Sequence, residues 1–207
     1  MLLLVSGASG AGKTTARVIA SKELDDRFEH VELWHLGPIP DVPTVAWRQQ
    51  QVEVAVQRAI ALEGDGRHLL LAGDPIPLGE ALAAPSADRI DIAGLLLDID
   101  ETAHRARLAE RQDPPELLPL HLGFADWMRH HAVDPTYVPE AVTNDAWPEM
   151  RWERWVGRSD LDGRWGMSVI DTSDRDPFEV GAAVAAWCRE AVAGDAPVFR
   201  TGWFAQS

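Results

Sequence analysis

The sequence contains very little cysteine and very little lysine. Its single cysteine, Cys188, excludes an internal disulfide and a metal site built from several thiolates, so we expect a thiol packed in the core. Lysine occurs only as Lys13 and Lys22, and the other basic residues are arginines. The near absence of cysteine agrees with a reducing compartment, and we expect the protein to be cytoplasmic.

Positive charge and long apolar runs are also scarce. The formal net charge is −14 at pH 7, which disfavours nucleic acid or an anionic membrane as a partner because both need a positive field. No apolar run approaches the roughly 20 residues of a membrane-spanning helix. The opening MLLLVSG has no basic leader or small-residue cleavage site, so residues 2–6 are interpreted as a buried strand.

Apolar runs alternate with helical patterns along the chain. This alternation predicts one α/β domain over residues 1–207, with a parallel sheet covered by helices on both faces. The runs that we interpret as strands are residues 2–6, 31–35, 68–73, 94–99 and 167–171.

Several helix ends can be placed from capping residues. A long helix is expected from an N-cap at Thr44 to Glu63, where GDG at 64–66 stops it. Another begins near Asp100. The last begins in DPFE, with Asp176 as N-cap and Glu179 closing a capping box.

Two segments do not follow the alternation. Residues 113–166 form an irregular stretch that we interpret as a lid-like insertion over one end of the sheet. It holds five tryptophans, Trp127, Trp147, Trp152, Trp155 and Trp165. The apolar tail from Phe199 either packs on the body or forms a contact in a homodimer.

The stretch GASGAGKT, residues 7–14, has the spacing of a phosphate-binding loop between a strand and a helix. Its glycines allow backbone N–H groups to turn toward phosphate, and the helix N-terminus adds partial positive charge. Lys13 is expected to reach the β- and γ-phosphates, and Thr14 to ligate Mg²⁺. We therefore expect ATP and Mg²⁺ as cofactors. The predicted nucleotide-binding residues here are Gly7, Ala8, Ser9, Gly10, Ala11, Gly12, Lys13, Thr14 and Thr15.

Two other classes of phosphate-loop protein fit less well. A GTPase needs a base-reading N-K-x-D, but TNDA at 143–146 lacks the lysine, and DIAG at 91–94 leads into a strand instead of following one. A motor ATPase usually has a catalytic glutamate after its acidic strand end. Here Asp74 is followed by proline, which is compatible with metal binding but poorly suited to a hydrolytic base.

An arginine pair follows the fourth expected strand. RLAER places Arg107 and Arg111 one helical turn apart, with Arg105 nearby. Two guanidiniums on one face can stabilise negative charge on a transferring phosphoryl group. The alternative is a solvated helix face on which the arginines pair with Glu101 and Glu110.

The chain resembles the small P-loop kinases, a group that includes adenylate, cytidylate, shikimate and gluconate kinases and chloramphenicol phosphotransferase. The resemblance lies in GASGAGKT, in LLLDIDETAHRARLAER and in VIDTSDRDPFEV. It implies a three-layer α/β/α fold with sheet order 2-3-1-4-5. It also implies that Arg107 lies near adenine, that Arg111 approaches the phosphates, and that the loop at Thr172–Asp174 contacts the base.

In these kinases the acceptor lies between the second and third strands, so the resemblance assigns residues 36–66 to acceptor binding. The substrate-binding candidates are Trp34, His35, Asp41, Arg48 and Asp74. Arginines are few in this region and carboxylates surround them, which favours a neutral hydroxyl acceptor over a nucleoside monophosphate. Asp74 is the first candidate for the catalytic base or a Mg²⁺ ligand.

These observations predict an ATP- and Mg²⁺-dependent kinase that phosphorylates a hydroxyl of a nucleoside, a sugar-like metabolite or an antibiotic. Lys13, Asp74, Arg107 and Arg111 are its expected catalytic residues. A nucleoside monophosphate kinase is the alternative enzyme. The alternative of another class is a nucleotide-binding regulatory protein that docks a partner through its tryptophan-rich segment.

Overall fold

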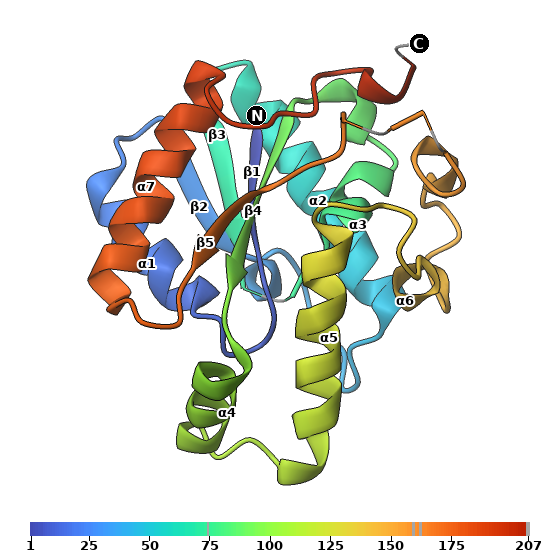
Figure 1. Ribbon diagram of the computed structural model, residues 1–207. Helices are drawn as coiled ribbons and strands as arrows, with labels where there is room; N and C mark the ends of the chain where they lie inside the picture. The colour runs from blue at the N-terminus through green and yellow to red at the C-terminus, as the bar shows by residue number, and fades with distance from the viewer. Residues whose placement is uncertain (74, 159, 162, 206–207) are drawn as a thin grey trace.

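A computed structural model of the chain describes residues 1–73, 75–158, 160–161 and 163–205. Five parallel strands form one sheet in the order β2-β3-β1-β4-β5, which confirms the expected topology (Figure 1). The strands are β1 (Leu2–Ser6), β2 (Phe28–Glu32), β3 (His68–Ala72), β4 (Ile92–Asp98) and β5 (Ser168–Asp171).

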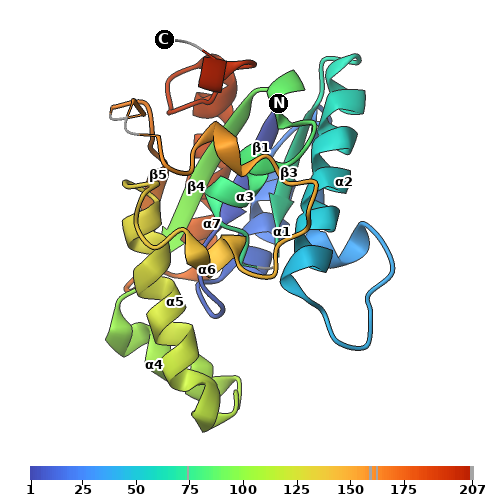
Figure 2. The same ribbon diagram turned by 90° about the vertical axis from the view of Figure 1, so that its right-hand side faces the viewer.

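Helices cover both faces of this sheet. α1 and α7 lie on one face and α2 and α3 on the other, whereas α4 and one end of α5 extend beyond the carboxyl ends of the strands (Figures 1 and 2). The helices are α1 (Lys13–Glu23), α2 (Val45–Glu63), α3 (Leu78–Ala83), α4 (Glu101–Glu110), α5 (Leu118–His131), α6 (Glu140–Thr143) and α7 (Pro177–Ala193). Among the described residues, no helix has the length and apolarity needed to cross a membrane.

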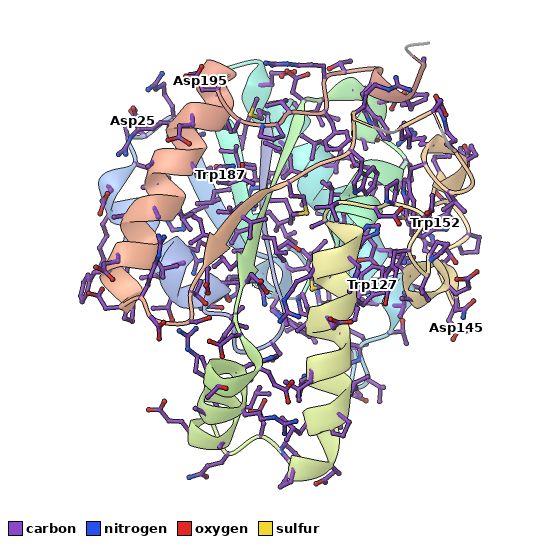
Figure 3. The ribbon with its side chains drawn as sticks, viewed as in Figure 1. Asp25, Trp127, Asp145, Trp152, Trp187 and Asp195 are labelled. Atoms are coloured by element: carbon purple, nitrogen blue, oxygen red, sulfur yellow. The ribbon has the colours of Figure 1, made fainter. Side chains whose placement is uncertain are left out.

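The central strand β1 contributes to two hydrophobic cores. Leu2 and Leu4 pack in the core beneath α2 and α3, and Leu3 and Val5 pack in the core beneath α1 and α7. All four side chains are completely buried. Trp187 joins the second core from α7 (Figure 3). Burial on both faces explains why β1 is a continuous apolar run instead of an alternating one.

The predicted helix starts are confirmed. Thr44 caps α2 by accepting a hydrogen bond from the Trp47 amide at 3.1 Å, and Asp100 caps α4. Asp176 and Glu179 form the expected capping box of α7. These signals are reliable because each depends on hydrogen bonds between residues two or three positions apart.

The prediction of a strand at 31–35 is wrong in its ends. The strand β2 occupies Phe28–Glu32, and a 3₁₀ turn at Leu33–His35 follows it. β2 lies at the edge of the sheet, so its half-exposed residues produce a weaker apolar pattern than the buried strands. Trp34 therefore lies beyond the carboxyl end of the sheet.

The tryptophan-rich segment packs on a face of the sheet. Trp155 is fully buried, and its Nε1 donates to the Gly79 carbonyl at 3.0 Å. Trp127 and Trp152 lie on the side of the molecule opposite α7 (Figure 3). Of the predicted lid-like insertion 113–166, the junction of α4 and α5 is what extends past the sheet (Figure 1). Closure by this junction stays a prediction.

Arg154 of the tryptophan-rich segment is also buried. Its guanidinium donates to the carbonyls of Leu82 at 3.1 Å, Ala84 at 2.6 Å and Pro85 at 2.9 Å. These bonds satisfy carbonyls at the end of α3, so Arg154 stabilises the packing of the segment.

The tail packs back on the body as far as Ala205. Phe199 forms an antiparallel bridge with Ile92 at the amino end of β4, and Trp203 is buried against Trp165. The expectation of a homodimer contact through the tail stays a prediction.

Candidate active site

The loop between β1 and α1 has the shape of an anion site. Gly12 is the N-cap of α1 in a left-handed conformation, with φ +94°, and no side chain among the described residues caps the helix. Backbone amides at the start of a helix have no carbonyl partner within the helix, and the helix dipole there favours a negative ligand. The residues fit a bound phosphate.

Lys13 already points its charge into this loop. Its side chain is buried, at 5% exposure for the residue, and Nζ donates to the carbonyls of Gly7 at 2.8 Å and Ala8 at 2.7 Å. These two bonds hold the ammonium group against the loop backbone, where its positive charge favours an anion.

Arg107 of α4 and Arg111, the C-cap of that helix, contact two different loops. Arg107 Nη1 donates to the Thr172 hydroxyl at 3.1 Å, and Nη2 donates to the Thr172 carbonyl. Arg111 Nη1 donates to the Ser9 hydroxyl at 3.3 Å. Arg105 instead forms the surface ion pair with Glu101 that the alternative interpretation described.

One cavity of about 780 Å³ connects these groups. The strand order places Trp34, Gly73 and Pro75 on the β2–β3 side of the phosphate loop, and the α4 arginines with Thr172 on the β4–β5 side. Both sides meet at the loop. The lining residues are Ser9, Gly10, Ala11, Gly12, Lys13, Thr14, Thr15, Ala16, Trp34, Gly73, Pro75, Arg107, Glu110, Arg111, Thr172, Arg175, Pro177 and Val180.

The predicted acceptor residues separate in the structure. Trp34 lines the cavity and packs on Trp47, with ring centroids 5.1 Å apart. His35 and Asp41 are exposed, and neither is among the described residues that line the cavity. Asp74 lies outside the described residues.

Arg48 is engaged by a buried carboxylate. Its Nε donates to Glu80 Oε2 at 2.9 Å and its Nη2 to Glu80 Oε1 at 2.6 Å. The Glu80 side chain is completely buried, so the pair has little solvent to screen it. Arg48 therefore supports the packing of α2 on α3 and is not on the described cavity wall.

The sequence did not predict the buried residue that contacts the phosphate loop or the cavity residues that follow Thr172. His104 is fully buried under the phosphate loop, and the only hint in the sequence is its spacing of four from Leu108 on one helix face. Burial lowers the pKa of His104, while its hydrogen bond to Ser9 opposes that shift. Arg175 follows Thr172 in the same loop, one position beyond the segment predicted to contact the base, and Pro177 is the first residue of α7.

The fold and the phosphate loop together define the class: the chain has the fold of the small P-loop kinases. Its structure is similar to that of a sugar kinase from Janibacter sp. HTCC2649, with a TM-score of 0.56, 16% identity, and coverage of 93% of this chain and 96% of that one. It is also similar to the APS kinase of Mycobacterium tuberculosis, solved in complex with AMPPNP and APS. There the TM-score is 0.50, with 18% identity and coverage of 91% and 96%. No family model and no curated protein sequence matches the chain.

Proposed function

We propose that the protein is an ATP-dependent phosphotransferase that phosphorylates a hydroxyl group of a small molecule. The observation that supports this most strongly is a cavity that continues across the phosphate loop from the β2–β3 side to the β4–β5 side. A nucleotide held on the β4–β5 side would direct its terminal phosphate toward an acceptor on the β2–β3 side. The kinase fold and the nucleotide analogue bound by the similar APS kinase agree with this arrangement.

Four side chains would act on the nucleotide, its phosphates and Mg²⁺ in the proposed transfer. Bound ATP would supply the phosphoryl group, and the acceptor oxygen would form the new P–O bond as the bond to ADP breaks. Lys13 and Arg111 would neutralise charge on the phosphates, and Arg107 would orient the base through Thr172. Thr14 lines the cavity, where its hydroxyl would hold Mg²⁺.

The proton of the acceptor hydroxyl needs a base. We assign this role to Asp74, because it directly follows Gly73, which lines the acceptor side of the cavity. Among the described residues, no cluster of three or more metal-ligating side chains occurs. Mg²⁺ would thus depend on Thr14, phosphate oxygens and water, with Asp74 as a further ligand or partner.

The acceptor side favours a neutral molecule. The described residues that line it, Trp34, Gly73 and Pro75, have no basic side chain, and the cavity's cations lie in the phosphate loop or on the β4–β5 side. The nearby Arg48 is neutralised by Glu80. Trp34 offers a flat surface to a sugar ring, a nucleobase or an aromatic antibiotic. The described residues on this side offer no cation to the phosphate of a nucleoside monophosphate.

The direct test is ADP release from Mg·ATP with a panel of nucleosides, nucleoside monophosphates, sugars and hydroxyl-bearing antibiotics. We expect one neutral acceptor to stimulate release well above the rate without acceptor. Stimulation by monophosphates alone would establish the nucleotide kinase instead. Tight ATP binding with no stimulated release across the panel would favour the regulatory protein.

A further inference from the structure

The histidine beneath the phosphate loop contacts the loop backbone directly. His104 lies on α4, is 0% exposed, and its Nε2 is 2.6 Å from the carbonyl oxygen of Ser9. The only other residue that α4 buries is Leu108, one turn later on the same face. A leucine would fill the position of His104 without the free-energy cost of burying a polar ring. The presence of a histidine therefore indicates that its polar atoms have a role.

The hydrogen-bond pattern assigns one form of the ring. A carbonyl oxygen only accepts, so Nε2 must carry the hydrogen that it donates to Ser9. Nδ1 has no partner within the part of the chain that the structure describes. Burial lowers the pKa of His104 and favours the neutral ring. The neutral Nε2–H tautomer is therefore the form that satisfies this contact.

The bond to Ser9 also orients the next amide. The Ser9 carbonyl and the Gly10 N–H belong to one planar trans peptide and point in opposite directions. With the carbonyl held toward α4, the Gly10 N–H faces away from α4, and Gly10 lines the cavity. A Cβ on Gly10 would lie 3.3 Å from Leu108 and 3.4 Å from His104, so α4 packs directly on this peptide.

A second contact, from the C-cap residue of α4, reaches Ser9 but lies nearer the surface. Arg111 donates to the Ser9 hydroxyl at 3.3 Å, and its side chain is 51% exposed. Water can replace a bond made at the surface, whereas the buried bond from His104 has no such substitute. His104 is thus the fixed support of the loop and Arg111 the adjustable one.

We propose that His104 is a positioning residue, which presets the Gly10 N–H toward the phosphates by holding the Ser9 carbonyl. This inference rests on the proposed function for the identity of the ligand. It predicts that the donor at Nε2 matters, and not the bulk of the ring alone. Nucleotide affinity and the environment of the Gly10 amide should both follow that donor.

The experiment compares His104→Leu, which removes the donor, with His104→Gln, which retains an N–H at similar reach, and with His130→Gln at an exposed position. For each we would measure Mg·ADP and Mg·ATP binding by calorimetry, the Gly10 amide resonance of the ligand-free protein by NMR, and the thermal unfolding midpoint. We expect about tenfold weaker binding and a displaced Gly10 resonance in His104→Leu, with substantial recovery in His104→Gln. His130→Gln should match the wild type.

Unchanged affinity and an unchanged Gly10 resonance in folded His104→Leu would overturn the proposal. If that variant does not fold, ¹⁵N-histidine NMR of the wild type decides: the proposal requires the Nε2–H tautomer, and the Nδ1–H tautomer rules it out. These readouts need no acceptor and no turnover. A wild type that binds no nucleotide but shows the Gly10 shift on substitution would refute the proposed function while retaining the positioning role.

Discussion

Arg107 holds both the hydroxyl and the backbone carbonyl of Thr172, a residue 65 positions later in the chain. The Thr172 hydroxyl also lies 2.9 Å from the Asp98 carbonyl, and the Thr172 amide donates to the same carbonyl. Through these bonds, α4 fixes the loop after β5 to the end of β4. The guanidinium of Arg107 therefore adds to the bonds that shape the β4–β5 side of the cavity.

Arg107→Ala should weaken nucleotide binding. Without the contacts to Thr172, the loop after β5 is held less firmly, and we expect the binding free energy of ATP to weaken by about 1–1.5 kcal/mol. The KM for ATP should then rise roughly tenfold, with a smaller change in kcat. Arg105→Ala is the matched control, because Arg105 is on the same helix and pairs only with Glu101 among its ion pairs in the described structure. An equal effect of both substitutions would show that helix charge, and not the Thr172 contact, is responsible.

Lys13→Ala should abolish transfer and leave the fold intact. The ammonium group lies inside the phosphate loop, so its loss removes charge stabilisation that water cannot replace, and kcat should fall at least about 10²-fold. Lys22→Ala replaces the only other lysine, which is exposed. Steady-state ADP release together with circular dichroism measures both effects. Retained turnover in Lys13→Ala would refute the assignment of the loop.

Trp34→Ala should affect the acceptor and not the nucleotide. Loss of an aromatic contact of about 1 kcal/mol or more predicts a several-fold to tenfold higher KM for the acceptor, with the KM for ATP unchanged. Trp34→Phe keeps a flat ring and should behave more like the wild type. A higher KM for ATP in Trp34→Ala would place this side chain on the nucleotide side.

Trp155→Ala should destabilise the protein without altering its site. Removal of a fully buried indole is expected to lower the free energy of unfolding by about 3–5 kcal/mol. Trp155→Phe should lose less, about 1–2 kcal/mol, since chiefly the bond to the Gly79 carbonyl disappears. Denaturant unfolding measures both, and nucleotide binding under native conditions is the control. Weaker nucleotide binding at unchanged stability would instead make this segment part of the lid.

His131 should make stability fall in mild acid. Burial lowers its pKa from 6.5 to about 4, and its Nε2 accepts a hydrogen bond from the Gly79 amide at 3.2 Å. The unfolded chain takes up the proton near pH 6.5, whereas the folded ring resists it until about pH 4. Its contribution is fully present above pH 6.5 and declines as the pH falls to 4, by about 3 kcal/mol.

The check is the free energy of unfolding at several pH values between 4 and 7. His131→Gln keeps an acceptor for Gly79 but does not titrate, so its pH slope should be shallower than that of the wild type. His130→Gln is the control, because the neighbouring His130 side chain is half exposed. Parallel slopes for wild type and His131→Gln would contradict the prediction.

Local chemistry made much of this fold predictable from the sequence. The capping box of α7 and the N-cap at Thr44 involve residues within three positions of each other, so their spacing alone predicts the helix starts. The sheet order depends on contacts between distant residues. It was predicted from the resemblance to the small P-loop kinases, which rests partly on the phosphate loop and on the helix that carries Arg107. The comparison with known structures confirms that fold.

What the sequence did not predict depends on distant packing. Nothing near Arg154 in the chain indicates that the end of α3 will supply carbonyls for it, some 70 residues away. His104 has the same difficulty, since its role depends on which face of α4 meets the phosphate loop. Both side chains are buried polar groups whose partners are distant backbone carbonyls. Only the tertiary structure shows that they support the backbone and do not bind a ligand directly.

The apolar sequence of β1 has a consequence for the register of this strand in the sheet. In most strands, a slip of one residue would exchange buried and exposed side chains, and this cost fixes the register. β1 is apolar toward both cores, so such a slip would cost it little hydrophobic burial. Contacts at its ends then help to set its position: the Leu2 amide donates to the Asp91 carbonyl at 2.8 Å, and the Ser6 hydroxyl donates to the Ile76 carbonyl at 2.5 Å. Such end contacts contribute to how far the phosphate loop extends from the sheet.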